Sequence, residues 1–168
     1  MARVGGWEFD VATLKQVWTA EVYEIHEVGL DYEPTVSKGI DFYAPEAKPI
    51  IAQAVQRALD HGEPFDLELP FITAKGNRLW VHAIGQAQRR NGKTTKVLGT
   101  FQDITARKQA EEALQQGEKR FRALVEQATD LVAVIDREGT CRYASPSFKP
   151  MLGYAPEELI GKDLFLLV

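Results

Sequence analysis

Three strand-like runs between residues 65 and 102 constrain the fold more than any other feature of this sequence. Apolar and polar residues alternate strictly in Phe65–Phe71, and strand-forming residues return in 78–88 and in 95–102. Such patterns are typical of strands with one buried face. Turn residues separate the runs, and the Asn91-Gly92 step is a strong hairpin signal. The segment therefore predicts a three-stranded antiparallel meander.

The residues before the meander add two short strands and several helices. Trp7–Val11 alternates as a half-buried strand does, and residues 17–19 give a second short strand signal. Residues 50–59 place apolar side chains on one helix face, and Gly62 is suited to a left-handed cap. Pro70 lacks an N–H, which predicts an edge strand or a bulge there. Together these signals predict a small α+β domain with helices over one face of its sheet.

Residues 106–127 change character and carry a heptad pattern. A seam with alternating spacings of four and three is formed by Ala110, Leu114, Gly117, Phe121 and Leu124. A helix of about 22 residues would be about 33 Å long. We expect a homodimer through this helix, because such a seam needs a partner helix or an adjoining domain to bury it. The alternative stays open that the helix is amphipathic and lies on its own domain, since Gly117 weakens its middle.

Residues 128–168 repeat the opening of the chain. Strand patterns at 131–136 and 141–144 are followed by short helical patterns at 147–152 and 156–160. The order of strand, turn, strand and two short helices matches the order at the start of the sequence. We interpret this segment as an internal repeat that is incomplete.

Composition and charge exclude several classes of protein. The formal net charge is −4, and no segment is basic enough to predict a nucleic-acid partner. No apolar run approaches the roughly 18 residues needed to span a bilayer, so neither a membrane segment nor a signal peptide is expected. The lone Cys141 cannot form an internal disulfide and fits a reducing compartment, so we expect a cytoplasmic location.

An ordered set of motifs along nearly the whole chain resembles the PAS family of sensory domains. Phe101–Thr105, followed by a charged helix, is similar to the Asp-Ile-Thr ending of PAS domains and the signalling helix behind it. Pro64–Glu68 and Lys75–Val81 are similar to the region that leads into the family's meander. Leu152–Lys162 resembles part of the first half of another PAS domain.

The resemblance implies both a division of the chain and a fold. It implies a PAS sensory domain in residues 1–105, a linker helix in 106–127 and the N-terminal half of a second PAS domain in 128–168. The implied fold is a five-stranded antiparallel sheet in the order 2-1-5-4-3, with helices over one face that enclose a pocket. A long signalling helix follows the sheet.

The resemblance also implies a place in a larger signalling protein. The commonest hosts of PAS domains are sensor histidine kinases of two-component systems, followed by cyclic-di-GMP enzymes. The sequence contains no phosphoacceptor-helix motif, no kinase nucleotide-binding motif and no Gly-Gly-Asp-Glu-Phe signature. We therefore expect no enzyme activity within this chain and assign no catalytic residue. The absence of Cys-x-x-Cys and His-x-x-x-His pairs also predicts no metal site.

The strongest candidate for a functional element is the junction of Asp103, Ile104 and Thr105. A Thr or Asp at this position can accept hydrogen bonds from the first N–H groups of the following helix. The resemblance implies that this junction transmits strain in the sheet to the helix. The alternative is a plain helix cap without a signalling role, and both descriptions can hold together.

A small-molecule pocket is the second candidate. The aromatic and aliphatic residues that could line it are Trp18, Ile25, Phe42, Val55, Leu67, Trp80 and Phe101. The sequence requires no cofactor and does not identify a ligand.

An alternative function is a redox or gas sensor that binds haem or flavin. A haem would need one of His26, His61 or His82 on the pocket face. His61 beside a helix end is explained by the helix dipole, and His82 fits a packed strand position. A flavin–cysteine adduct needs a cysteine beside the flavin, and the first domain has none. The sequence thus favours a non-catalytic sensory and dimerisation segment that acts by conformational change.

Overall fold

The computed structural model describes residues 4–13, 15–126 and 130–163. The chain divides into two compact units, Met1–Gln109 and Ala110–Val168, which are described separately here.

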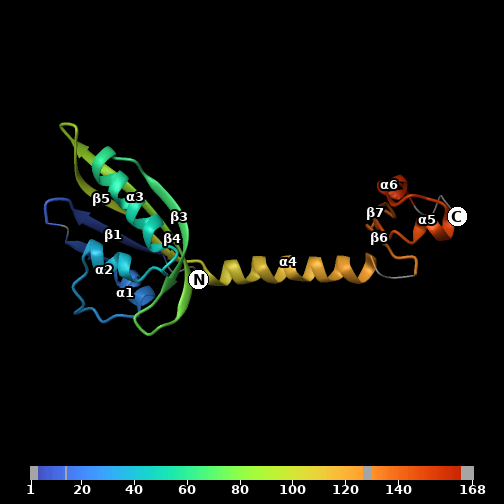
Figure 1. Ribbon diagram of the computed structural model, residues 1–168, viewed down its shortest axis with the longest axis horizontal. Coiled ribbons are helices and arrows are strands. Elements are labelled where there is room, and N and C mark those ends of the chain that lie inside the picture. Colours follow the sequence, from blue (N-terminus) through green and yellow to red (C-terminus); the bar gives the residue numbers. More distant parts are fainter. Residues whose placement is uncertain (1–3, 14, 127–129, 164–168) are drawn as a thin grey trace. The chain divides into compact units, whose positions relative to one another are not determined.

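The first unit is built on a five-stranded antiparallel sheet (Figure 1). The strands, in their order across the sheet, are β2 (Gln16–Trp18), β1 (Val4–Asp10), β5 (Lys93–Asp103), β4 (Arg78–Arg90) and β3 (Phe65–Ile72). This confirms the predicted fold class and strand order. Pro70 lies in β3 at the edge of the sheet, where its missing N–H leaves no gap between two strands.

Three helices cover one face of this sheet: α1 (Ala20–His26), α2 (Val36–Asp41) and α3 (Lys48–His61). The predicted amphipathic helix is α3, which buries Ile51, Val55 and Ala58 and ends at Gly62 with φ of 75°. A left-handed conformation of this kind favours glycine because it has no Cβ. The helices and the inner sheet face share one apolar core.

Two glycines open a gap in the inner face of the sheet. Register pairs Phe65 with Gly85, Gly85 with Gly99, and Gly99 with Trp7, so the four residues form one row across β3, β4, β5 and β1. A Cβ at Gly85 would lie 2.3 Å from the ring of Phe65, a separation that no packed structure allows. The rings of Trp7 and Phe65 stack with centroids 6.0 Å apart. Glycine therefore lets these two rings lie close to the sheet.

The long helix α4 (Thr105–Glu126) begins in the first unit and continues into the second. In the second unit, β6 (Ala133–Ile135) and β7 (Cys141–Ala144) form an antiparallel pair, followed by α5 (Phe148–Leu152) and α6 (Pro156–Leu159). These elements follow the predicted order of the incomplete repeat. A small core is formed by Cys141, Ala144, Leu159 and Phe148. The thiol of Cys141 is fully buried there.

Candidate functional site

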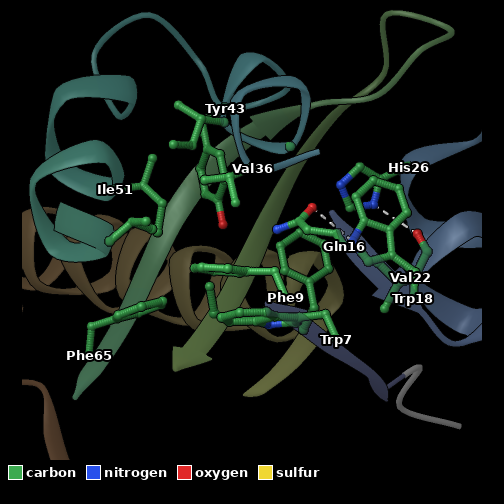
Figure 2. A pocket seen from close by; sticks show the side chains of 15 residues that line it. Trp7, Phe9, Gln16, Trp18, Val22, His26, Val36, Tyr43, Ile51 and Phe65 are labelled. Carbon is green, nitrogen blue, oxygen red and sulfur yellow. Dashed lines mark hydrogen bonds between the residues drawn. The ribbon is translucent and has the colours of Figure 1, made fainter. Parts of the chain in front are cut away.

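A cavity lies between the helices and the inner face of the first unit's sheet. Trp7, Phe9 and Phe65 form one wall, and Tyr43, Ile51 and Val36 lie opposite them (Figure 2). The space open to the centres of water molecules is about 50 Å³. Among the described residues that line this cavity, none is a lysine, arginine, aspartate or glutamate.

His26 lines the cavity from the end of α1 and is only 3% exposed. Its Nδ1 lies 2.8 Å from the carbonyl oxygen of Val22, which can only accept, so Nδ1 carries the proton. The imidazole packs against the rings of Trp18 and Phe101, with centroids 4.2 and 5.0 Å away. Burial lowers the pKa of His26 to about 4, against an ordinary value of 6.5. The ring is therefore neutral at pH 7, with Nε2 as an acceptor.

Tyr43 and Gln16 place two further polar groups at the cavity. The Tyr43 hydroxyl points into it, and burial raises the pKa of this phenol, which keeps it protonated (Figure 2). Gln16 accepts a hydrogen bond of 3.1 Å from the Trp18 indole N–H through Oε1. That bond orients the amide, so its Nε2 is turned toward the cavity (Figure 2).

The predicted pocket residues fall into two groups. Trp18, Val55 and Phe101 line the cavity, whereas Ile25, Phe42, Leu67 and Trp80 do not. The first three of that second group pack elsewhere in the core. Trp80 lies on the outer face of the sheet and is 39% exposed, because Val81 and Ala83 occupy the inward positions of β4.

No sequence pattern indicated Tyr43 and Gln16, which give the cavity its character together with Trp7, Phe65 and the uncharged His26. The alternation of β1 carried a signal for Trp7, since Trp7 and Phe9 share the inward face. No local pattern indicates that Phe65 would reach Trp7, because their proximity depends on the glycine row across three strand pairings.

The junction between β5 and α4 is tied directly to β4. Asp103 Oδ1 accepts hydrogen bonds from both the N–H and the hydroxyl of Thr105, at 2.9 and 2.6 Å. The Trp80 N–H donates to Thr105 Oγ1, and the Ile104 N–H donates to the Trp80 carbonyl, each at 2.9 Å. Ile104 is 4% exposed. Asp103, Ile104 and Thr105 thus fasten the start of α4 to the neighbouring strand.

The first turn of α4 is also held by the outer face of the sheet. Glu68 of β3 makes ion pairs with Arg107 and Lys108. The hydrogen bonds from Lys108 and Arg107 hold the pKa of Glu68 below its ordinary value. Lys108 Nζ also lies 5.2 Å from the centre of the Trp80 ring, within range of a cation–π contact. Sequence analysis did not identify Glu68.

The predicted seam residues lie on α4 with their expected spacing. Leu114 and Leu124 are 74% and 68% exposed, and Phe121 makes an edge contact with Tyr143 of the second unit, with ring centroids 6.3 Å apart. Ala110 and Gly117 are also exposed. Homodimerisation through this seam stays a prediction.

The described residues contain no cluster of three or more His, Cys, Asp or Glu that could hold a metal ion. No helix among residues 4–13, 15–126 and 130–163 is long and apolar enough to cross a bilayer.

Comparison with family models identifies the class of domain that this fold and junction define. Two models described as the PAS fold match the chain, one over residues 16–101 and the other over 119–168. The first match covers half of the chain. The chain therefore belongs to the PAS-fold family.

Two relatives of this chain have names that place them in signalling. The sensor protein FixL of Bradyrhizobium diazoefficiens is 24% identical over 98% of this chain and 33% of its own length. The probable diguanylate cyclase DgcE of Escherichia coli K12 is 23% identical over 98% of this chain and 15% of its own length. The chain thus spans a third or less of the length of these two relatives, and the likeness to them supports a PAS sensor role.

A solved structure with the same fold comes from a sensory box histidine kinase/response regulator of Burkholderia thailandensis. It superposes with a TM-score of 0.57 at 23% identity and covers 73% of this chain and 92% of that structure. At this identity the likeness concerns the fold alone.

The cavity does not fit a haem or a flavin. Pockets for ligands of that size enclose at least about 300 Å³, whereas the space open to water centres here is about 50 Å³, or roughly 200 Å³ when widened by a water radius of about 1.4 Å. The His26 imidazole is packed against the rings of Trp18 and Phe101, and the first unit contains no cysteine. The haem or flavin alternative is therefore not supported by the residues present.

Proposed function

We propose that this chain is the sensory and dimerisation segment of a longer sensor protein, with a histidine kinase of a two-component system as the host. In this proposal, residues 1–105 sense a ligand or partner, 106–127 form the signalling helix, and 128–168 begin a second PAS domain. The observation that carries it is the hydrogen-bonded junction of Asp103, Ile104 and Thr105 with Trp80.

The junction supports transmission of a conformational change because it couples the sheet tightly to the helix. The main chain of Trp80 is hydrogen-bonded to the Thr105 hydroxyl and to the Ile104 N–H. A shift of β4 must therefore move the first turn of α4 or break these bonds. Glu68 adds a second attachment from β3. A ligand that binds two sheet positions with different affinity would thereby bias two positions of the helix.

Substitution of Thr105 in the full-length protein tests this transmission. Thr105→Ala removes the hydroxyl that bridges Asp103 and Trp80, and we expect kinase autophosphorylation to lose its dependence on the stimulus. The loss of the hydroxyl's hydrogen bonds to Trp80 and Asp103 should destabilise the first unit by about 1 kcal/mol, which leaves it folded. Thr105→Ser keeps the hydroxyl and should retain regulation.

Thr95, which lies in β5, provides a matched control on the strand that leads into the junction. Its hydroxyl donates to the Gln88 carbonyl at the far end of β5, away from the junction. Thr95→Ala should leave regulation unchanged. If Thr105→Ala is folded and regulates output as the wild type does, the proposed transmission role is wrong.

Dimerisation through α4 is supported by the exposed seam of Leu114, Phe121 and Leu124. Leu114→Glu would place like charges opposite one another in a parallel two-helix seam, so we expect a weaker dimer in analytical ultracentrifugation. Glu112→Gln, at the heptad position opposite the seam, is the control and should not change the association constant. Equal association of Leu114→Glu and wild type would argue against the seam.

A diguanylate cyclase is the second candidate host, and the match to DgcE over 98% of this chain supports it. Both hosts would use the same junction and helix. The full-length protein separates them: incubation with ATP would label a histidine kinase with phosphate, whereas incubation with GTP would yield cyclic-di-GMP from a cyclase.

A further inference from the structure

Three polar atoms at the cavity make no hydrogen bond to the described part of the chain. They are the Tyr43 hydroxyl, the Gln16 Nε2 and the His26 Nε2, and none of them has a hydrogen-bond partner among the described residues. Among the described residues, every side-chain nitrogen or oxygen that is fully buried has a hydrogen-bond partner. These three atoms have no partner, so they are not fully buried and have open space beside them. Polar atoms that face such a space are completed by water or by a bound molecule, so the cavity can offer all three atoms to a ligand.

The chemical role of each atom is fixed by its surroundings. Gln16 Oε1 is taken by the Trp18 indole, which leaves the amide N–H groups as donors. His26 Nδ1–H is directed at the Val22 carbonyl, which leaves Nε2 as an acceptor on a neutral ring. The Tyr43 phenol is neutral and can donate or accept. A bound molecule must therefore offer both an acceptor and a donor.

The other residues that line the cavity restrict the charge and the shape of a bound molecule. No lysine, arginine, aspartate or glutamate is among the described lining residues, so an ionic ligand would lose its hydration without a counter-charge. Trp7, Phe9 and Phe65 present stacked rings along one wall, with Trp7 and Phe65 inclined by only 15° (Figure 2). Flat aromatic surfaces of this kind favour a flat apolar ligand.

The size of the cavity limits that ligand to one ring. The centres of water molecules can occupy about 50 Å³ of the cavity. If this space is treated as a sphere and its radius is increased by the water radius of about 1.4 Å, the whole cavity has a volume of roughly 200 Å³. A dry cavity of about 150 Å³ is known to bind benzene. One six-membered ring with a small polar group fits this space, and a fused two- or three-ring system does not.

We propose that this cavity binds an uncharged, single-ring aromatic molecule with a carboxamide-like polar edge. Its carbonyl accepts from Gln16 Nε2 and the Tyr43 hydroxyl, and its N–H donates to His26 Nε2. This inference rests on the proposed sensory function, because it names the class of ligand that the first unit senses.

The test uses three probes of similar shape against the whole chain at pH 7.5. Benzamide is neutral and carries the required polar edge, benzoate is its charged counterpart, and ethylbenzene lacks polar atoms. Isothermal calorimetry and the thermal midpoint measure binding. We expect benzamide to bind at least tenfold more tightly than benzoate and ethylbenzene. Equal binding of benzoate refutes the charge argument, equal binding of ethylbenzene refutes the polar argument, and no binding of benzamide refutes the proposal.

Tyr43→Phe locates the site. It removes only the hydroxyl and should weaken benzamide binding about tenfold, while Tyr23→Phe, whose ring packs on Trp18 outside the cavity, should not. Gln16→Leu provides a second variant should Tyr43→Phe not fold. Unchanged benzamide affinity in the folded variant overturns the assignment.

Failure of this inference can be told apart from failure of the proposed function. Binding is measured on the chain alone, without any output. Benzamide that binds the chain while Thr105→Ala regulates as the wild type does would leave the ligand class standing and the transmission role refuted. Altered regulation by Thr105→Ala without benzamide binding would refute the ligand class only.

Discussion

Acidification from pH 8 to pH 5 should destabilise the first unit through His26. The pKa of this residue is about 4 in the folded protein, because burial disfavours the charged ring, whereas its ordinary value is 6.5. As the pH falls below 6.5, His26 becomes protonated in the unfolded chain but stays neutral in the folded chain. The unfolded state is then favoured, and the loss of stability grows until the pH approaches 4.

The size of this loss follows from the two pKa values. Relative to pH 8, the free energy of unfolding should fall by about 1 kcal/mol at pH 6 and by about 2 kcal/mol at pH 5. Carboxylates with lowered pKa, such as Glu27 and Glu68, lose their stabilising effect only as the pH falls below about 4.5. The range between pH 5 and pH 8 therefore separates the effect of His26 from that of these carboxylates.

Urea unfolding followed by tryptophan fluorescence measures this effect in the first unit, since all three tryptophans, Trp7, Trp18 and Trp80, lie there. His26→Phe fills the same aromatic surroundings without a titrating group and should remove the loss of stability between pH 8 and pH 5. His26→Gln offers a second non-titrating variant. His61→Gln, at the exposed end of α3, is the control and should keep the loss. If His26→Phe loses as much stability as the wild type over this range, the argument from burial is refuted.

Two glycines give further predictions. Gly85→Ala should destabilise the first unit by about 2 kcal/mol in urea unfolding, because its Cβ would meet the Phe65 ring at 2.3 Å. The control Gly6→Ala, whose Cβ would have Thr19 Cγ2 at an ordinary 3.4 Å as its nearest neighbour, should change stability by less than about 0.5 kcal/mol. In α4, Gly117→Ala meets nothing within 4 Å and should stabilise the helix by about 1 kcal/mol, seen as higher circular dichroism at 222 nm during heating; lower helicity would contradict the helical role of this residue.

Local patterns in the sequence determined the elements of the fold. Alternation with a period of two predicted β3, and strand-forming residues predicted β4 and β5. The missing N–H of Pro70 predicted an edge strand or a bulge, and the structure places it at the edge. Asn91-Gly92 predicted the hairpin, and both residues have positive φ in the structure. The motif around Asp103 and Thr105 predicted the junction of sheet and helix. These signals lie within a few residues of one another, so they can be recognised without knowledge of the tertiary structure.

Only the tertiary structure decided which side chains meet. Trp7 and Phe65 are distant in sequence and stack because three strand pairings align them with Gly85 and Gly99. Glu68 reaches Arg107 and Lys108 because β3 and the start of α4 flank β4. The chemistry of His26 likewise depends on the rings that enclose it, since burial and not residue type lowers its pKa. Register and burial are long-range properties, and no local sequence pattern encodes them.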